Sequence, residues 1–542
     1  MVLKEEEYKA LEDIVGPRNI SEDPVILDSY ACWGGRFHTR PEAVILPAST
    51  EEVQAIIKVC NRYKIRVKCH STGWNPMGGV SLPRTVLLDL RRMNRIIEIN
   101  EERMYAVVEP YVTAGQLQAE LMKRGLCNHL IGAGASCSVV ACTACYHGET
   151  PMGIYTGHAA ENLLAVEWVL PNGEILRTGS LGSTGNWFCA EGPGPSVRGL
   201  VRGIWGTKGA FGVITKIGYK LHPWHGPPKL EITGRLPAYR YKIPENMDIH
   251  TVAFHSMKDL LESAYLLYNA KIGYVVHKQF GFFGNLQWAM IKIAMDPTKT
   301  YWQLEEVLND PEVQKITEEL KYSYQIILMG VSKKHLEWQE KALQQILNKV
   351  GGWIVQACEE PAVKEFMFAW LHRLGYKNYN FYVGGYLPGY SPPGAPRALI
   401  PAIEESIRAK KEYIEKKLIV DDGADAVMGP LSCIGGGGNM YFENFCLFDI
   451  ADPESAKAAM EFLLKSLEWQ REHGYPGNNG GPQDAMVGTG LLLGLSEEQA
   501  IARMREILKK CTHPDTYRWQ AKFKKVFDPN DVSCYEYLRL EE

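Results

Sequence analysis

The stretch IRVKCHSTGWNPMGGVSLPRTVLLDL, residues 65–90, decides how the rest of the chain is interpreted. It begins and ends with apolar, β-branched runs that predict strands at Ile65–Lys68 and Thr85–Leu90. Small, hydrogen-bonding and glycine residues lie between them. Glycine lets backbone N–H groups approach a ligand closely, and successive N–H groups form a concave anion site. The stretch therefore predicts a diphosphate-binding loop between two strands, with an ordinary strand connection as the alternative.

The whole chain has the composition of an ordinary globular protein. Its 542 residues are 46% hydrophobic and 23% charged, with a net charge of −4. This length predicts several domains, and the charge balance does not favour binding to nucleic acid or to an anionic membrane. The start MVLKEEEYKALEDIV predicts an acidic amphipathic helix rather than a signal peptide, and no apolar run approaches the ~20 residues of a membrane span. Thirteen cysteines without the spacing of a disulfide scaffold favour a reducing, cytoplasmic location.

Local signals divide the first 225 residues into short strands and helices. Residues 41–47 are apolar and predict a strand, and capping boxes at 49–52 and 113–116 each precede a helix. Residues 162–179, NLLAVEWVLPNGEILRTG, predict a hairpin around a Pro-Asn-Gly turn. Residues 192–223 predict a helix, a glycine bend and a further strand. The first part of the chain is thus expected to be mixed α and β.

Four of these segments occur in an order typical of one flavoprotein family. They are RPEAVILPASTEEVQAIIKVCNRYKIRV, the glycine loop, YTGHAAENLLAVEWVLPNGEILRTG and GPSVRGLVRGIWGTKGAFGVITKIGYKLHP. Together they resemble the FAD domain of the vanillyl-alcohol oxidase / p-cresol methylhydroxylase superfamily, which also includes glycolate and D-lactate dehydrogenases. The resemblance implies an α+β fold with a two-lobed FAD-binding domain (1–228), an α+β cap that binds substrate (229–470), and a C-terminal segment (471–542) that returns to the FAD domain.

The resemblance also implies FAD, lying extended between the two lobes. The glycine loop would wrap the diphosphate, the small residues of 129–157 would line the ribityl chain and the ring, and the strand after the glycine bend would flank the adenine. This loop departs from the family's usual Arg-Gly-Gly-Gly or Gly-Gly-His-Ser because its glycines have moved. The implied residues are Cys69, His70, Ser71, Thr72, Gly73 and Trp74 at the diphosphate, Gly134, Ser136, Ser138, Ala141, Cys145 and Gly148 at the ring, and Gly212, Val213 and Ile214 at the adenine.

The sequence also raises the question of covalent flavin attachment. His70 resembles the linkage histidine of berberine-bridge-type relatives but is displaced from its position, and Tyr441 and His473 lie where other relatives place their linkage. No complete linkage motif is present, so non-covalent FAD is the preferred interpretation.

Three cysteines lie within the stretch expected to face the flavin. Cys137, Cys142 and Cys145 have a C-x4-C-x2-C spacing, similar to the ligand run of plant-type ferredoxins. Small cysteine side chains buried beside the flavin are the preferred interpretation. An iron–sulfur electron carrier or scaffold is the alternative from another functional class, and no other metal site is expected.

Catalytic candidates follow from the same resemblance. Counted back from the hairpin at 162–179, His158 falls where the alcohol-oxidase branch has an acidic residue beside flavin N5. Histidine exchanges a proton near neutral pH, so His158 is the first candidate, ahead of Tyr475 and His473; a structural histidine is the alternative. Tyrosines offer flat, hydrogen-bonding walls to an aromatic substrate, although they also suit a half-buried strand. The tyrosines expected at the substrate are Tyr155, Tyr382 and Tyr386.

After Pro228 the sequence alternates between strands and helices without glycine loops, which predicts the cap domain. Asp452 and Pro453 have the types expected at a helix N-cap and first turn. The predicted strands are 230–236 and 325–331, and the predicted helices are 258–268, 302–308, 335–350 and 453–471.

These features predict an FAD-dependent oxidoreductase that transfers a hydride from an aromatic or phenolic alcohol to flavin N5. Tyr475 matches a phenolate-binding segment of relatives, but Asn478 or Asn479 replaces the arginine that accompanies it. The alternative is a 2-hydroxyacid dehydrogenase, in which Arg373 or Arg198 would bind the carboxylate. Without a nicotinamide motif, electrons are expected to pass to oxygen or to an electron-transfer flavoprotein or iron–sulfur protein, and a homo-oligomer is expected.

Overall fold

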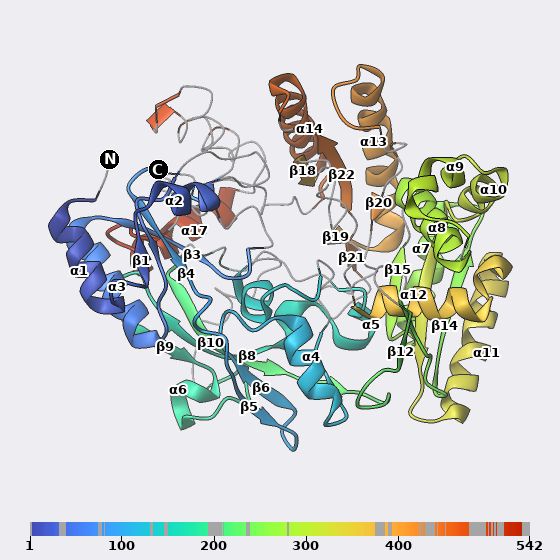
Figure 1. The fold of residues 1–542 in the computed structure, drawn as a ribbon, viewed down its shortest axis with the longest axis horizontal. Helices are drawn as coiled ribbons and strands as arrows, with labels where there is room; N and C mark the ends of the chain where they lie inside the picture. The colour runs from blue at the N-terminus through green and yellow to red at the C-terminus, as the bar shows by residue number, and fades with distance from the viewer. Residues whose placement is uncertain are drawn as a thin grey trace.

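The computed structural model describes most of the chain (Figure 1). No helix in the part that it describes is long and apolar enough to cross a membrane. The described residues are 3–31, 40–73, 79–80, 82–129, 134–145, 150–192, 207, 209, 211–234, 239–278, 281–296, 298–373, 385–388, 393–421, 424, 427–428, 439–441, 443–449, 451–475, 495–496, 498–499, 502, 506 and 514–533.

The first lobe is a four-stranded sheet with helices on both faces. Its elements are α1 (Glu5–Val15), β1 (Ile20–Ser21), α2 (Pro24–Ala31), β2 (Val44–Ile45), α3 (Thr50–Tyr63), β3 (Arg66–His70) and β4 (Thr85–Asp89). The strand order is β1-β2-β4-β3, with β2, β4 and β3 parallel and β1 antiparallel to β2. Helices α1 and α3 share one apolar core with the sheet, and α2 packs on a second. Because parallel strands end at the same edge, the loop after β3 and the end of β4 lie together.

The second lobe is an antiparallel sheet in the order β5-β6-β10-β8-β9. The predicted hairpin and the predicted capping box at Thr113 and Gln116 are both confirmed. The elements of this lobe are β5 (Ile96–Asn100), β6 (Tyr105–Val108), α4 (Ala114–Met122), β7 (Leu126–Cys127), η2 (Ala141–Cys145), α5 (Gly153–Thr156), η3 (Ala159–Asn162), β8 (Leu163–Val169), β9 (Ile175–Thr178), α6 (Ser180–Thr184), β10 (Val213–Lys220) and β11 (His222–Pro223).

The two lobes are joined at a buried carboxylate on β8. Glu167 is 5% exposed and accepts hydrogen bonds from Thr50 Oγ1 (2.9 Å) at the start of α3 and from Lys216 Nζ (2.5 Å) on β10. Arg177 Nε donates to its other oxygen at 3.0 Å. A buried carboxylate needs such partners, because its desolvation is otherwise uncompensated. Glu167 therefore ties both lobes together.

The C-terminal segment returns to this pair of lobes. In α17 (Pro514–Phe527), the last residue Phe527 lies against Trp168 of β8, with ring centroids 6.2 Å apart. Beyond the helix, Val532 O accepts a hydrogen bond from Val67 N at 2.7 Å, so the segment runs beside β3. Figure 1 shows α17 behind the first lobe, well apart from α14. Such a return is what the resemblance implied for this part of the chain.

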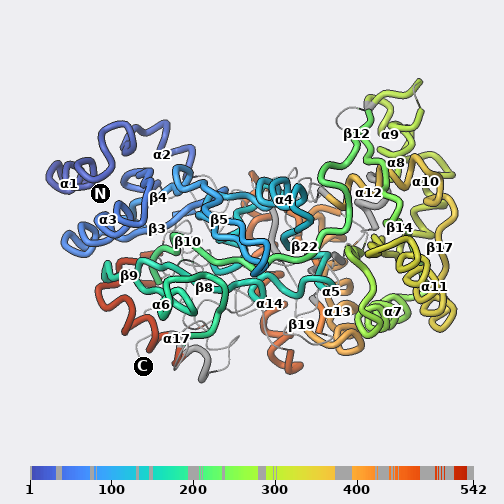
Figure 2. The backbone as a smooth tube through the Cα atoms, turned by 90° about the horizontal axis from the view of Figure 1, so that it is seen from below, coloured from blue at the N-terminus to red at the C-terminus, as the bar shows by residue number. Residues whose placement is uncertain are grey.

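The cap begins with a four-stranded antiparallel sheet, in the order β15-β16-β14-β17. Helices α7 and α11 cover one face and α8 and α12 the other. Figure 2 shows this unit at the opposite end of the molecule from the first lobe. Its elements are β12 (Ile232–Thr233), β13 (Arg240–Tyr241), β14 (Met247–Ala253), α7 (Met257–Ala270), β15 (Val275–Lys278), α8 (Gly281–Met295), η5 (Tyr301–Gln303), α9 (Leu304–Leu308), α10 (Pro311–Glu319), β16 (Ser323–Met329), α11 (Lys333–Val350), β17 (Trp353–Ile354), η6 (Gln356–Cys358) and α12 (Pro361–Arg373).

A second, smaller unit completes the cap, with α13 and α14 packed on the sheet β18-β22-β20. The predicted helices at 258–268, 335–350 and 453–471 are confirmed. Two predictions need correction, since 302–308 divides into η5 and α9, and the described part of 230–236 contains only the short β12. The elements of the unit are β18 (Gly385–Pro388), β19 (Pro393–Gly394), α13 (Pro396–Glu415), β20 (Val427–Met428), β21 (Met440–Tyr441), β22 (Glu443–Phe448) and α14 (Pro453–Glu472).

Candidate functional site

The loop predicted to bind a diphosphate begins at the C-terminal end of β3. Ser71, Thr72 and Gly73 are partly buried, and Gly73 has a φ of 71°, which a residue with a Cβ rarely adopts. Thr72 Oγ1 accepts a hydrogen bond from the backbone N–H of Ser138 in the second lobe at 3.1 Å. Trp74 lies outside the described residues. The structure thus brings together two segments that were both predicted to contact FAD.

A third segment reaches the same place. A Cβ built on Gly209 would lie 3.3 Å from Cys69 Sγ, so the backbone just before β10 lies close to the end of β3. The backbone N–H of Thr207 also donates to Ala144 O at 3.0 Å. Stretches that begin near residues 69, 138 and 207 therefore converge between the lobes, although they are widely separated in the sequence. This convergence is the arrangement that an extended cofactor requires.

The segment predicted to lie along the flavin ring has an unusual backbone. Gly134 has a φ of 139°, and Ala141–Cys145 forms a π-helix, a conformation that occurs frequently at functional sites. Ser138 Oγ donates to Pro110 O at 2.5 Å and accepts from the backbone N–H of Ala141 at 3.0 Å, which fixes the entry to this helix. Ser136 is exposed, and Gly148 lies outside the described residues.

The predicted adenine residues lie at the start of β10. Gly212 has a φ of 96°, and a Cβ there would lie 2.1 Å from Val169 O, so the close packing of two strands requires glycine. Val213 is buried in the core of the first lobe and Ile214 in that of the second. Their side chains are thus occupied in packing, and only their backbones are available to a ligand.

His158 lies between α5 and β8, where its side chain takes part in local structure. It is 3% exposed, and its Nδ1 accepts the backbone N–H of Ala160 at 3.4 Å at the start of η3. Its carbonyl accepts from Asn162 Nδ2 at 3.1 Å. When Nδ1 accepts, the neutral ring carries its proton on Nε2, so His158 is set up as a hydrogen-bond donor through that atom.

Tyr155 belongs to a group of aromatic side chains where the second lobe meets the cap. Its hydroxyl donates to Pro223 O at 2.8 Å, and its ring centroid lies 5.5 Å from that of Tyr274 and 6.0 Å from that of His222. Burial raises the pKa of Tyr155. His222 Nε2 lies 2.7 Å from Asn162 Oδ1, and burial, with a smaller effect of Lys220, lowers its pKa to about 3. His222 is therefore neutral at physiological pH.

His372, at the end of α12, completes this group and was not anticipated from the sequence. Its ring lies 5.3 Å from that of Trp224 and 6.3 Å from that of Tyr274. Burial lowers its pKa to about 4, and its Nε2 has no hydrogen-bond partner among the residues that the structure describes. A histidine at the end of a mostly apolar helix gives no local sequence signal of this position. We call Tyr155, His222, Trp224, Tyr274 and His372 the aromatic seam.

The remaining predicted residues lie elsewhere or outside the described residues. Tyr475 donates its hydroxyl to Ala398 O at 2.5 Å and stacks on Trp469, and exposed His473 stacks on the same ring. Both side chains are thus engaged at the end of α14. Tyr382 and Arg198 lie outside the described residues, as do the side chains of Tyr386, Arg373 and Tyr441.

The three cysteines of the ferredoxin-like spacing behave as packing residues. Cys137 is buried, Cys142 and Cys145 are partly buried, and all three pack with the apolar core of the second lobe. They are not among the groups of three ligand-type atoms within 4.8 Å of one another in the described part of the chain. The iron–sulfur alternative therefore has no support.

One such group does occur, on the cap. Ligand atoms of Asp248, His250 and Glu340 lie within 4.8 Å of one another, within the part of the chain that the structure describes. The ammonium group of Lys364 is already 2.7 Å from Asp248 Oδ1. The positive charge of Lys364 neutralises the Asp248 carboxylate. An ion-pair network therefore accounts for the cluster without a metal.

Comparison with known families now identifies the lobes. A family model described as an FAD binding domain matches residues 41–179. These residues are therefore similar to the FAD binding domains of that family. FAD is therefore the cofactor, as predicted. The residues present fit it, since the FAD-binding domain carries a positive-φ glycine loop at the strand ends, and the segments beginning near residues 138 and 207 close in from the second lobe.

Two curated proteins show what the FAD-binding domain is similar to. The flavoprotein subunit of 4-cresol dehydrogenase [hydroxylating] from Pseudomonas putida is 35% identical over 193 residues, which are 34% of this chain and 35% of that protein. A probable mitochondrial D-lactate dehydrogenase from Danio rerio is 29% identical over 233 residues, 43% of this chain and 41% of that protein. Both are named as dehydrogenases, the enzyme class predicted from the sequence. The match spans well under half of either relative.

The fold extends beyond the FAD-binding domain. The crystal structure of p-cresol methylhydroxylase with substrate bound superposes with a TM-score of 0.73 and 19% identity, covering 99% of this chain and 97% of that one. At this identity the likeness establishes the fold alone. It confirms the predicted α+β architecture and the fold that the resemblance implied. The domain boundaries at 228 and 470 remain predictions.

Proposed function

We propose that this chain is an FAD-linked oxidoreductase that oxidises a small organic substrate. Support comes from the FAD-binding domain and from two relatives named as dehydrogenases. When bound, FAD would supply the redox chemistry as hydride acceptor, and the protein would supply orientation and electrostatics. The loop at Ser71–Gly73 would hold the diphosphate, and the π-helix would lie along the ring.

His158 is the residue that we assign to the reacting end. Its Nδ1 accepts a backbone hydrogen bond, so the neutral ring offers Nε2–H as a donor. A buried donor of this kind can steady negative charge that develops on the substrate oxygen or on the reduced ring. Tyr475 and His473 remain weaker candidates, because their contacts lie on Trp469 and Ala398.

We propose an aromatic or phenolic alcohol as the substrate class. The observation that carries this proposal is the aromatic seam, which places three tyrosine and tryptophan rings and two buried neutral histidines where the cap meets the FAD-binding domain. Flat walls of this kind favour a flat substrate through stacked and edge contacts. The unpartnered Nε2 of His372 would give a substrate hydroxyl one hydrogen bond, and the 4-cresol dehydrogenase relative is consistent with this class.

A 2-hydroxyacid is the second candidate substrate, and the D-lactate dehydrogenase relative favours it. This reaction needs a cation for the substrate carboxylate. Arg373 follows His372 directly at the end of α12, so its backbone lies next to the aromatic seam. Arg373→Met should then abolish reduction of the flavin by a 2-hydroxyacid, and should leave reduction by a phenolic alcohol much less affected.

Electron acceptor and location are proposed on more general grounds. Reduced flavin would pass its electrons to oxygen or to a protein acceptor such as an electron-transfer flavoprotein or an iron–sulfur protein, and a homo-oligomer is proposed. Cys60, Cys127, Cys142, Cys189 and Cys358 are free thiols, which supports a reducing compartment such as the cytoplasm.

Anaerobic bleaching of the flavin tests this proposal. Purified protein should carry flavin absorption bands that stay in the supernatant after acid precipitation. A panel of phenolic alcohols and 2-hydroxyacids should then contain compounds that bleach these bands without oxygen, and the effective class identifies the substrate. Protein that binds FAD but is bleached by no member of either class would contradict the proposed reaction.

A further inference from the structure

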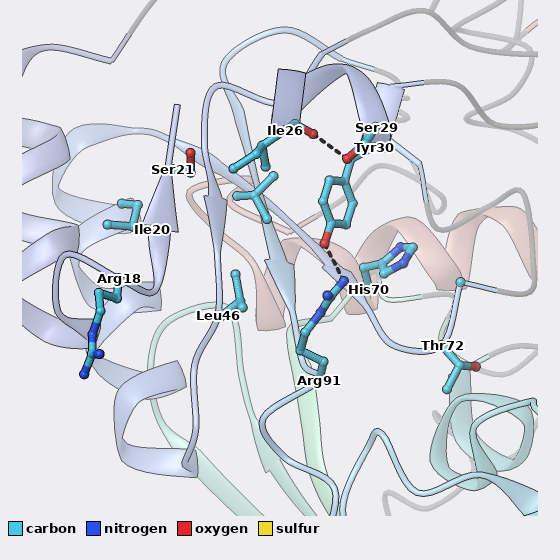
Figure 3. Close-up of a pocket in the computed structure, with 12 residues that line it drawn as sticks. Arg18, Ile20, Ser21, Ile26, Ser29, Tyr30, Leu46, His70, Thr72 and Arg91 are labelled. Carbon is cyan, nitrogen blue, oxygen red and sulfur yellow. Dashed lines mark hydrogen bonds between the residues drawn. The ribbon is translucent and has the colours of Figure 1, made fainter. Parts of the chain in front are cut away.

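A hydrogen-bonded group of three side chains lies beneath the diphosphate loop. Tyr30, on α2, donates its hydroxyl to Asp89 Oδ2 at 2.5 Å, at the end of β4. Arg91 donates to the same oxygen from Nε at 2.9 Å and from Nη2 at 2.6 Å, and its Nη2 also lies 2.7 Å from the Tyr30 hydroxyl. Figure 3 shows the tyrosine directed at the guanidinium, with His70 beside the phenol ring. We call Tyr30, Asp89 and Arg91 the carboxylate knot.

Asp89, at the centre of the knot, is completely buried. Its exposed fraction is 0%, so its charge depends on these partners and on the backbone N–H of Arg91, which donates to Oδ1 at 2.9 Å. Burial first, and then the hydrogen bond to Asp89, raises the pKa of Tyr30 well above its ordinary value. The phenol therefore stays protonated and remains a donor throughout the physiological pH range. Hydrogen bonds to a charged acceptor are shorter and stronger than neutral ones.

The knot is coupled to the loop through His70. His70 pairs with Asp89 in the parallel ladder, and its carbonyl accepts the backbone N–H of Leu90 at 2.9 Å. The His70 ring meets the ring of Tyr30 edge-on, with centroids 5.6 Å apart. The next residues are the predicted diphosphate loop, which Thr72 ties to the second lobe. The loop is thus held on one side by the knot and on the other by Ser138.

A cavity of about 790 Å³ is lined by residues of both the knot and the loop. Its walls include Tyr30 and Arg91 of the knot and His70, Thr72 and Gly73 of the loop. Tyr30 lies outside residues 41–179, the part of the chain that matches the FAD-binding family. A contribution from α2 to cofactor binding is therefore not assigned by that match.

We propose that Tyr30 is a positioning residue for FAD, which holds His70 and the diphosphate loop in their binding conformation through Asp89. The inference rests on FAD binding, which the proposed reaction shares, but not on the identity of the substrate. Without the phenol hydroxyl, Asp89 keeps only Arg91, and the end of β4, which pairs with His70 at the end of β3, loses its hydrogen bond to α2. The loop then has more conformations in the apo-protein, and FAD binding must restrict them, which weakens affinity.

The test compares two Tyr→Phe substitutions in the same lobe. Tyr30→Phe removes the donor to Asp89 but keeps the ring beside His70. Tyr8→Phe is the matched control, because its hydroxyl donates to a backbone carbonyl of this lobe, Ile20 O at 3.5 Å, and Tyr8 does not line the cavity. FAD dissociation constants are measured by titrating apo-protein and following flavin fluorescence. We expect Tyr30→Phe to raise the dissociation constant of FAD about tenfold, which corresponds to the loss of one hydrogen bond to a charged group. Tyr8→Phe should raise it by less than about twofold.

Two further measurements separate positioning from general destabilisation. Tyr30→Phe removes a donor from the buried Asp89 and should lower the melting temperature of the apo-protein more than Tyr8→Phe does, but both apo-proteins should remain folded at the temperature of the titration, so that unfolding does not account for the loss of FAD affinity. In an Asp89→Asn background, Tyr30→Phe should weaken FAD binding by less than about twofold, because Tyr30 acts through Asp89. Equal FAD affinity of Tyr30→Phe and wild type, or equal weakening by Tyr8→Phe, would overturn the proposal. Wild-type protein that binds no FAD would instead overturn the cofactor assignment, whereas FAD binding without substrate oxidation would leave the role of Tyr30 intact.

Discussion

Substitution of Glu167 by Gln should loosen the contact between the two lobes of the FAD-binding domain. The change keeps the volume of the side chain but removes the charge that accepts from Thr50 Oγ1 at 2.9 Å, Lys216 Nζ at 2.5 Å and Arg177 Nε at 3.0 Å. Removing one partner of a fully buried ion pair costs about 3–5 kcal/mol. The side chains of Lys216 and Arg177 are 22% and 50% exposed and regain water, so we expect a smaller loss of about 2–3 kcal/mol.

Thermal unfolding measures this loss. In a domain of about 200 residues, a change of this size lowers the melting temperature by about 5–10 °C. Glu174→Gln on the same hairpin is the control, because Glu174 is exposed and its side chain accepts from Asn172 Nδ2. Its melting temperature should stay within about 2 °C of wild type, the range of exposed pairs. Equal melting temperatures of the two variants at pH 7 would refute the assigned role of Glu167.

The same pair of variants predicts a pH dependence. Burial raises the pKa of Glu167, but the hydrogen bonds from Lys216 and Thr50 outweigh it, so the net pKa lies below the ordinary value. A carboxyl with a lowered folded-state pKa contributes stability that is fully present above its unfolded pKa, about 4.3. That contribution is lost as the pH falls through the folded pKa. The difference between wild type and Glu167→Gln should therefore be constant near neutrality and shrink in acid.

Three further predictions concern other parts of the structure. Gly212→Ala would place a Cβ 2.1 Å from Val169 O at a φ of 96°, so the variant should lose FAD and expose thiols to a labelling reagent. A variant with the flavin absorption spectrum of wild type would contradict the requirement for glycine at this position. His222 and His372 have pKa values of about 3 and 4, below the unfolded value of about 6.5, so protonation at lower pH favours the unfolded state. Together the two histidines should lower the unfolding free energy by about 4 kcal/mol between pH 7 and pH 5. Urea titrations of His222→Gln at the two pH values should show about half of this loss. Asp528→Asn breaks an ion pair with a nearly buried lysine and should cost about 3 kcal/mol, seen as earlier proteolytic release of the C-terminal segment; cleavage at the wild-type rate would count against it.

Local elements were predictable because their causes lie within a few residues. Ser49 accepts the backbone N–H of Glu52 at the start of α3, and Thr113 and Gln116 form the predicted reciprocal cap. The hairpin at 162–179 also forms around its turn. In each case the stabilising partner is close along the chain, so the residue types and their spacing are sufficient evidence.

Elements with distant partners were harder to predict. β14, an inner strand of the cap sheet, was not predicted; its partners β16 and β17 lie about 75 and 100 residues later. The segment 302–308 has a helical pattern but divides into η5 and α9, and the expected strand at 230–236 contains only β12 among its described residues. Propensity alone does not decide such boundaries, because tertiary packing overrides it.

The sequence by itself determined the kind of site: a glycine loop after a strand, a family order of segments, and hence FAD between two lobes. It could not determine which distant side chains complete that site, because no local pattern links Tyr30 with Asp89 or places His372 beside Trp224 and Tyr274. Those contacts exist only once strands far apart in the chain have paired and the helices have packed on them. The backbone conformation of a ligand-binding loop depends on residues that are close in the sequence. The burial that shifts a pKa or makes a carboxylate depend on its hydrogen-bond partners arises only in the assembled core.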